Sequence, residues 1–321
     1  MASSKTAAAR WLRALVNWFD TGPLVAPKDG VELPTLSDRI AWTRILPFVG
    51  MHLACLAVIW VGWSGVAVLV AVLGYFLRMF AITGFYHRYF SHRSFKTSRA
   101  GQFIFGLIGA TAVQRGPVWW AAHHRHHHAY SDKPEDVHSP LQHGFLRSHM
   151  GWFLTDSGFQ PDLRRVRDLL QFPELCWIDR FDIVVPVAFA SSMFGLGVLL
   201  EALAPQLGTN GAQMLVWGFF ISTVACYHGT YTINSLSHVF GTQRYRTGDT
   251  SRNNWLLALL TLGEGWHNNH HHFPSSTRQG FYWWEIDITY YILKMMSWLG
   301  IIWDLKPVPT SARDHSPRRI R

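Results

Sequence analysis

The stretch "ILPFVGMHLACLAVIWVGWSGVAVLVAVLGYFL", residues 45–77, contains no aspartate, glutamate, lysine or arginine. A helix needs about 20 apolar residues to cross the hydrocarbon core of a bilayer. The stretch is therefore long enough for a helical hairpin, provided that the second helix continues past Arg78. We place the turn at "GWSG", residues 62–65, and the first two spans at about residues 45–63 and 65–86. This pattern predicts a membrane protein.

A second apolar tract has the same design. From residue 183 to residue 243 the only charged side chain is Glu201, and the turn "APQLGTNG" interrupts the tract at residues 204–211. The tract predicts two further spans, at about residues 182–203 and 212–233. No part of the sequence alternates apolar and polar residues as a half-buried strand would. We therefore expect an all-α membrane protein with four transmembrane helices in two hairpins.

Basic residues indicate the orientation of these hairpins. Neither hairpin turn contains lysine or arginine, whereas basic residues cluster at the opposite ends of the spans. Arg10, Arg13, Lys28, Arg39 and Arg44 precede the first span, and Arg88, Arg93, Lys96 and Arg99 follow the second. By the positive-inside rule, we expect both termini and segment 87–180 on the cytoplasmic side, where that segment contributes to a helical cap.

The chain divides into an N-terminal cytoplasmic segment (1–44), an integral-membrane domain (45–305) and a basic C-terminal tail (306–321). The net charge of +9 fits an anionic lipid surface. No basic stripe with interleaved aromatic residues indicates a nucleic-acid partner. The three cysteines are widely spaced and form no CxxC motif, which predicts neither a disulfide framework nor a zinc site.

Four shorter segments outside the spans are expected to be helical. Residues 102–113 are apolar but too short to cross a bilayer, so we expect an interfacial or re-entrant helix. Residues 282–303 mix aromatic and acidic side chains, which is typical of an amphipathic helix lying against the membrane. Residues 160–182 are polar and helix-like, and residues 10–19 predict a short amphipathic helix.

Histidines are the second unusual feature of the sequence, with five of them in "HHRHHH", residues 123–128. The spacing i, i+3, i+4 places three on one helical face, namely His124, His127 and His128. His126 points nearly opposite His124, and His123 lies off the stripe, so we exclude both. A histidine run packs poorly, and metal binding would explain it.

Two further motifs repeat this arrangement. "HNNHHH", residues 267–272, places His267, His270 and His271 at the same spacing, with His272 as an extra member. "NSLSH", at the end of the last predicted span, places Asn234 and His238 four residues apart and again on one face.

His87 and His92, in "HRYFSH", are five residues apart, which corresponds to a turn of about 140° on an α-helix. Either the helix ends between them or they serve different ions. The nine histidines of the four motifs exceed what one ion can hold, so we expect two metal ions. Imidazole suits zinc, copper, iron and nickel, and the ligand type leaves the metal open.

Acidic residues near these motifs are expected to accept hydrogen bonds from the imidazole N–H groups, and we assign this role to Glu264, Asp132 and Asp136. The remaining histidines are interpreted as surface or satisfied core groups: His52, His138, His143, His149, His228 and His315.

The motifs "HRYFSH", "HRHHH" and "HNNHH", in that order and between two hydrophobic hairpins, resemble those of the membrane fatty-acid desaturases. The resemblance covers about residues 45–305. It is greatest to the stearoyl-CoA (delta-9) branch, because of "NSLSH", "GEGWHNNHHHFP", "SDKPEDVHSP" and "SHMGW".

This resemblance implies two iron ions and a set of ligands. The implied ligands are His87, His92, His124, His127, His128, His238, His267, His270 and His271, with Asn234 acting through a water molecule. It also implies a kinked tunnel for the acyl chain beneath the metals, and we assign Trp119, Trp120 and Tyr231 to substrate binding.

The implied reaction is the oxygen-dependent introduction of a cis double bond near the middle (delta-9) of a long-chain saturated acyl chain, with acyl-CoA as the expected carrier. Acid or base side chains cannot remove hydrogen from an unactivated methylene, whereas a reduced metal pair that activates oxygen can. Electrons would come from a separate donor: a ferredoxin, a rubredoxin or a b-type cytochrome with its reductase. Arg93, Lys96 or Arg164 would hold the coenzyme A phosphates.

The sequence departs from the animal acyl-CoA enzymes at two places. Ala122 and His123 stand where those enzymes carry Arg-Asp for the coenzyme A headgroup, and Tyr231 stands where a tryptophan is expected. A lipid hydroxylase, or a desaturase acting on phospholipid-bound chains, remains an alternative. A metal transporter would need ligands at the bilayer midplane, whereas these motifs lie at the span ends and beyond.

Overall fold

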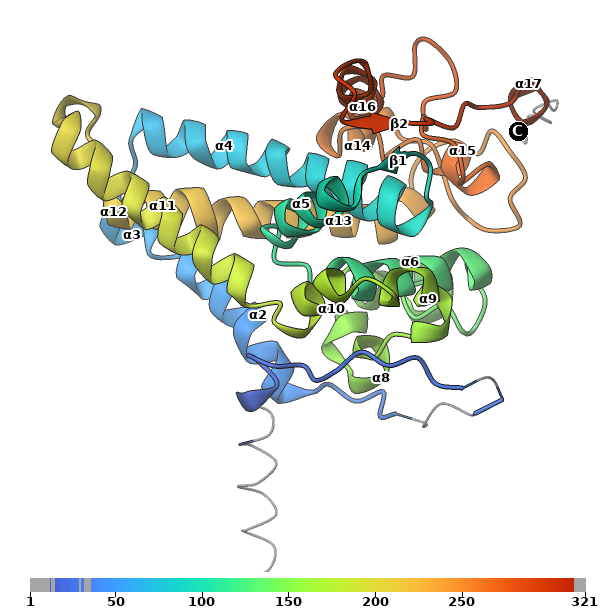
Figure 1. The fold of residues 1–321 in the computed structure, drawn as a ribbon, viewed down its shortest axis with the longest axis horizontal. Helices are drawn as coiled ribbons and strands as arrows, with labels where there is room; N and C mark the ends of the chain where they lie inside the picture. Colours follow the sequence, from blue (N-terminus) through green and yellow to red (C-terminus); the bar gives the residue numbers. More distant parts are fainter. Residues whose placement is uncertain (1–11, 13–14, 29, 32–35, 315–321) are drawn as a thin grey trace, which may run out of the picture.

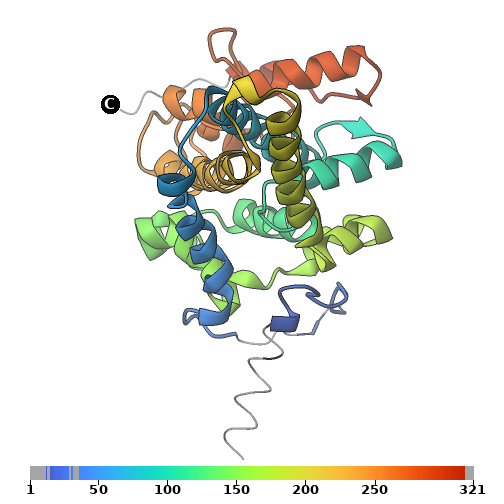
Figure 2. The same cartoon turned by 90° about the vertical axis from the view of Figure 1, so that its left-hand side faces the viewer.

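The computed structural model describes residues 12, 15–28, 30–31 and 36–314. The chain is mostly helical, as predicted (Figure 1). Long helices gather at one end of the molecule, and shorter helices joined by loops form a cap at the other end. In Figure 2 the far end of the long helices faces the viewer, and these helices form one bundle.

Three helices are long and apolar enough to cross a membrane: Trp42–Val61, Gly65–Ser91 and Val184–Leu203. The first contains α2 (Trp42–Cys55) and α3 (Val58–Val61), the second contains α4 (Gly65–Phe80) and the π-helix η1 (Ala81–Ser91), and the third is α11 (Val184–Leu203). They correspond to the first three predicted spans. Around the first turn Trp60 and Trp63 are 79% and 73% exposed, which suits contact with lipid rather than water.

The fourth predicted span is also helical. It consists of α12 (Gly211–Met214), the π-helix η6 (Leu215–Ile221) and α13 (Ser222–Asn234), which follow one another without a break. Within the described residues it is not among the helices long and apolar enough to cross a membrane. Polar side chains explain this, because Gln213, Ser222 and Thr223 lie buried on its inner side.

A buried arginine ties α4 to α13. Arg78 is 1% exposed and donates to the hydroxyls of Ser222 and Thr223 and to the carbonyl of Gly74. A charged group in the apolar interior is costly unless its donors are satisfied. These contacts fix the two helices that lead to the histidine motifs.

The remaining helices are short, most of them in the cap, and η5 lies in the turn between α11 and α12. These are α5 (Arg99–Ala110), α6 (Pro117–Tyr130), α7 (Pro140–His143), η2 (Arg147–Gly151), η3 (Trp152–Leu154), α8 (Asp156–Phe159), η4 (Leu163–Val166), α9 (Arg167–Leu170), α10 (Pro173–Arg180), η5 (Pro205–Leu207), η7 (Leu236–His238), α14 (Trp255–Leu260), α15 (His267–His272), α16 (Ile288–Trp298) and α17 (Thr310–Asp314).

One short β-ladder departs from the all-α prediction. Strand β1 (Lys96–Thr97) pairs antiparallel with β2 (Ile302–Trp303), with Lys96 opposite Trp303 and Thr97 opposite Ile302. Two residues are too few to produce an alternating pattern, so the sequence contains no signal for this ladder. It fixes the C-terminal part of the cap to the segment that follows η1.

The expected cap helices are present with altered bounds. The apolar segment 102–113 corresponds to α5, the segment 282–303 contains the shorter α16, and the polar segment 160–182 is divided into η4, α9 and α10. The helix expected over residues 10–19 lies partly outside the described residues, as do the last residues of the basic tail, 315–321.

Candidate metal centre and adjoining cavity

Helix α6 carries three of the predicted ligands, and contacts near both its ends fix its position. At its N-terminus the carboxylate of Asp179, on α10, accepts hydrogen bonds from the amides of Val118 and Trp119 at 2.8 and 2.7 Å. Free amides and a positive dipole end favour a carboxylate there. Further along, Arg125 donates to the carbonyl of Ser91 at 2.9 Å, which holds α6 against the end of η1.

The π-helical winding of η1 decides how His87 and His92 are placed. The amide of His92 donates to the carbonyl of His87 at 3.2 Å, an i→i+5 hydrogen bond. Residues five apart therefore lie one turn apart instead of about 140° apart as on an α-helix. Both histidines face the same group of nitrogens. The helix ends at Ser91, between the two histidines, which confirms the first of the two sequence-based alternatives. The second alternative, separate ions, is wrong, because both histidines belong to one group.

The nine predicted histidines form two groups, each with its ligand nitrogens within 4.8 Å of one another. The first group contains His87, His92, His124, His128 and His270. The second group contains His127, His238, His267 and His271. Helices α6 and α15 contribute to both groups, so the i, i+3, i+4 stripes predicted for them lie between the two candidate metal sites.

Distances within the second histidine group fit tetrahedral metal coordination. In the second group the Nε2 atoms of His127 and His271 are 3.3 Å apart and those of His238 and His267 are 3.2 Å apart. Metal–nitrogen bonds of about 2.05 Å in a tetrahedral arrangement would separate two ligand nitrogens by roughly 3.3 Å. In the first group the corresponding separations are shorter, 2.7 Å for His92 and His124.

The proton positions in the second group also require a cation. Nδ1 of His127 lies 2.9 Å from a carboxylate oxygen of Asp136, and Nδ1 of His271 lies 2.7 Å from one of Asp249. A carboxylate only accepts, so each Nδ1 carries the proton and each neutral ring keeps a lone pair on Nε2. Two lone pairs then face each other across 3.3 Å. A metal ion between the two nitrogens turns this repulsion into coordination. The residues of the second histidine group therefore fit a bound metal ion.

Two of the acids predicted to orient the histidines do so directly: Glu264 contacts Nδ1 of His87, and Asp136 contacts Nδ1 of His127. Asp132 acts through a hydroxyl: Nδ1 of His238 lies 3.2 Å from the hydroxyl of Thr250, which donates to Asp132 at 2.6 Å. Asp249 contacts Nδ1 of His271 directly and was not predicted from the sequence. Burial alone would raise the pKa of the Asp249 carboxyl, but the hydrogen bond from His271 and its neighbouring hydroxyls hold that pKa well below its usual range.

Seven of the nine histidine rings are held neutral by their surroundings. Burial, together with the neighbouring histidines, lowers the pKa of His124, His128 and His270 well below the usual value. Burial also lowers the pKa of His127 to about 3, against the opposing effect of Asp136. Neutral imidazole is the form that binds a metal, so the environment prepares these rings for coordination.

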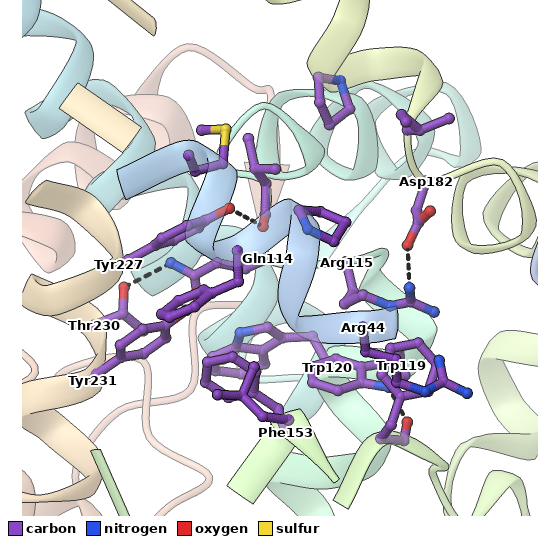
Figure 3. A pocket seen from close by; sticks show the side chains of 18 of the residues that line it. Arg44, Gln114, Arg115, Trp119, Trp120, Phe153, Asp182, Tyr227, Thr230 and Tyr231 are labelled. Carbon is purple, nitrogen blue, oxygen red and sulfur yellow. Dashed lines mark hydrogen bonds and ion pairs between the residues drawn. The ribbon is translucent and has the colours of Figure 1, made fainter. Parts of the chain in front are cut away.

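A cavity of about 630 Å³ adjoins the first histidine group. His124 and Asn234 line it, together with all three residues assigned to substrate binding, Trp119, Trp120 and Tyr231 (Figure 3). Its other walls come from α2, η3, α11 and η6 and are mostly apolar. The ring of Trp120 stacks on His124 with centroids 5.1 Å apart, so the aromatic wall reaches the candidate metal site.

Two polar pairs lie on the cavity wall. Nε2 of Gln114 donates to the hydroxyl of Thr230 at 3.0 Å, and Arg115 pairs with Asp182 at 2.7 Å (Figure 3). Because most of the lining is apolar, the cavity suits an apolar ligand.

The sequence matches the fatty acid desaturase family over residues 60–296. The chain belongs to the fatty acid desaturase family. It is 37% identical over 271 residues to the sn-1 stearoyl-lipid 9-desaturase of Anabaena variabilis, covering 84% of this chain and 94% of that protein. It is 38% identical over 276 residues to Delta-9 acyl-lipid desaturase 2 of Arabidopsis thaliana, covering 86% of this chain and 85% of that protein. Over 296 residues it is 35% identical to Acyl-CoA 5-desaturase AL21 of Anemone leveillei, covering 87% of each.

The desaturase is therefore an oxidoreductase that acts on acyl chains with oxygen, and its histidine groups can hold metal. The excluded histidines lie outside both groups. His126 contacts the carbonyl of Glu135 at 2.8 Å, His272 contacts that of Ala312 at 3.0 Å, and His123 packs against Trp119.

Two cavity residues of the desaturase, Tyr227 and Thr230, and the orienting acid Asp249 were not recognised in its sequence. Tyr227 and Thr230 share one face of α13 with the predicted Tyr231, at i, i+3, i+4, and all three line the cavity. This spacing was an available signal, since it continues to Asn234. Asp249 had none, because it lies between η7 and α14, where no periodicity links it to His271.

Proposed function

We propose that this desaturase introduces a cis double bond near the middle, at delta-9, of a long-chain saturated acyl group. Two iron ions would be held by the nine histidines, with Asn234 acting through a water molecule. The observation that supports this most is the apolar cavity, which begins beside His124 and Asn234 and continues between α2 and α11. An acyl chain lying in it would pass the first histidine group along its length.

The side chains of the cavity bind and orient the chain. When bound, the iron pair would supply oxygen activation strong enough to take hydrogen from an unactivated methylene. Trp120 stacks on His124 and forms a flat wall next to the first group, while the buried ring of Tyr231 forms a wall on α13. These rings exclude water and limit which carbon lies next to the metal, and such positioning lowers the barrier without further acid or base groups.

We also propose that the helix Gly211–Asn234 is the fourth span and that the cap faces the cytoplasm. Its buried polar residues face its neighbours in the bundle, which suits a helix inside a membrane domain. The turn between α11 and α12 carries no lysine or arginine, which supports a non-cytoplasmic position for it.

The carrier that the cavity favours is a glycerolipid. Among the described residues that line the cavity, the cations are Arg44 and Arg115. Arg44 pairs with Asp156 at 3.2 Å, and Arg115 pairs with Asp182 at 2.7 Å. Coenzyme A carries several phosphate charges, which call for cations without such partners. An acyl chain that is ester-linked in a lipid and enters from the bilayer does not need such cations. Two of the relatives are named as lipid desaturases.

Acyl-CoA, the carrier expected from the sequence, is the second candidate, and Acyl-CoA 5-desaturase AL21 supports it by similarity. The cations expected to hold its phosphates do not line the cavity. Arg93 pairs with Asp168 at 3.1 Å and Lys96 with Asp304 at 2.8 Å. Arg164 pairs with Asp162 at 2.8 Å.

An assay with three carriers tests the proposal. Deuterated stearate is supplied to the purified enzyme and a reductant as a glycerolipid, as the coenzyme A thioester and as the carrier-protein thioester, and the double bond is located by mass spectrometry. We expect conversion of the lipid and a delta-9 bond. Conversion of a thioester alone would refute the lipid carrier. A hydroxylated product would refute desaturation, and a bond near the methyl end would refute the mid-chain assignment.

A further inference from the structure

The segment Val113–Arg115 is conformationally strained. Val113 has a φ of 58° and Arg115 a φ of 68°. Among the described residues other than glycine, this is the one place where two positive φ values fall within three residues. The left-handed region is disfavoured for any residue with a Cβ and is a marked outlier for β-branched valine. Such a conformation persists only where the surroundings hold it in place.

Contacts from α13 hold the first two residues of this segment, while the hydroxyl of Tyr86 and the carboxylate of Asp182 hold Arg115. The hydroxyl of Tyr227 donates to the carbonyl of Val113 at 2.9 Å, and Gln114 donates to Thr230 at 3.0 Å (Figure 3). Tyr227 is only 5% exposed, so its hydrogen bond is shielded from water. The same face of α13 carries Tyr231, so one helical stripe both walls the cavity and restrains the strained segment.

The restrained segment itself forms part of the cavity wall. Val113, Gln114 and Arg115 all line the cavity, as do Tyr227 and Thr230. Successive methylenes of an acyl chain are chemically alike, so a desaturase can select one carbon only through the position of the walls. A wall segment with a costly backbone conformation is poised to move if its restraint is lost.

We propose that Tyr227 is a positioning residue for regiospecificity: through the Val113 carbonyl it holds the strained segment, and the segment sets which methylene of the acyl chain lies next to the metal. The inference rests on the proposed function, since it assumes an acyl chain in the cavity. It goes beyond that function by naming the backbone segment and the hydroxyl that fix the site of the bond.

The first test removes the hydroxyl alone. Tyr227→Phe keeps the ring, and Tyr75→Phe is the matched control, because the hydroxyl of Tyr75 also donates to a backbone carbonyl, that of Leu260, at 2.8 Å but does not line the cavity. One hydrogen bond corresponds to roughly a fivefold change in an equilibrium, so we expect the ratio of minor to major double-bond isomers to rise about fivefold in Tyr227→Phe. Tyr75→Phe should keep the wild-type isomer ratio.

The second test asks whether the strain is the cause. Glycine adopts φ near 58° without cost, whereas alanine does not. Adding Val113→Gly to Tyr227→Phe should restore the wild-type isomer ratio, while adding Val113→Ala, which also shortens the side chain, should not. The metal content of each variant is measured alongside, since it should not separate the glycine from the alanine variant.

The outcomes distinguish this inference from the proposed function. No unsaturated product from the wild-type protein would refute the proposed function. An active wild type with the same isomer ratio in Tyr227→Phe and Tyr75→Phe would overturn the inference alone. So would equal rescue by glycine and alanine at position 113.

Discussion

At the scale of residues, the candidate metal site depends on acids that fix the proton of His87, His127 and His271. Asp249 lies 2.7 Å from Nδ1 of His271, which leaves Nε2 free for metal. Replacing such an orienting carboxylate typically weakens metal binding by about 10–100-fold. We therefore expect Asp249→Asn to lower metal affinity within this range and to lower activity with it. Metal titration of the chelator-treated protein measures the effect.

Asp304→Asn is the control for this change, because Asp304 is 60% exposed in its pair with Lys96 and lies outside both histidine groups. It should bind metal as the wild type does. Equal affinities for Asp249→Asn and the wild type would show that the second histidine group does not depend on this carboxylate.

At the scale of elements, helical periodicity accounts for what the sequence could predict about the site. The i, i+3, i+4 spacing identified the ligand faces of α6 and α15, because an α-helix repeats every 3.6 residues. The placement of His87 and His92 could not be predicted in this way. The π-winding of η1 depends on which carbonyl each amide meets, and side-chain types carry no clear sign of that choice.

Long apolar runs likewise predicted the first three spans, because length and hydropathy alone identify them. The fourth predicted span is less apolar because it carries polar residues, such as Ser222 and Thr223, which pair with Arg78 of α4. The helix α4 is far away in the sequence, so this pairing depends on tertiary contacts. The division of the nine histidines into five and four has the same origin, because it depends on which helices face one another.

The four-span arrangement predicts which turns are accessible from outside. Gln206 is exposed in the turn between α11 and α12, and Lys133 is exposed in the cap. In a variant without native cysteines, Gln206→Cys should react with an impermeant thiol reagent on intact cells, whereas Lys133→Cys should react only after permeabilisation. The reverse pattern would overturn the orientation, and labelling of both from one side would show that α11 does not cross the membrane, which would overturn the second hairpin.

At the scale of the whole molecule, the neutral histidines make the stability of the metal-free protein depend on pH. Burial lowers the pKa of His127 to about 3, whereas an unfolded chain titrates near its ordinary value of 6.5. Between these values the unfolded chain binds more protons, so the free energy of unfolding falls as the pH falls. Each such histidine contributes roughly 1.4 kcal/mol per pH unit in this window.

We therefore expect the melting temperature of the metal-free protein in detergent to decrease steadily from pH 7 to pH 5. Thermal unfolding at matched ionic strength, after treatment with a chelator, measures this. A melting temperature that stays constant or rises on acidification would contradict the neutral, buried state of the histidines.

The central claim is that nine histidines in two groups hold two iron ions for desaturation. The most direct measurement is the metal content of detergent-purified protein that is active, made under iron sufficiency and analysed against protein concentration. The account predicts close to two irons per chain, rising and falling with the activity of each preparation. A ratio near one, or active enzyme that contains zinc in place of iron, would contradict it.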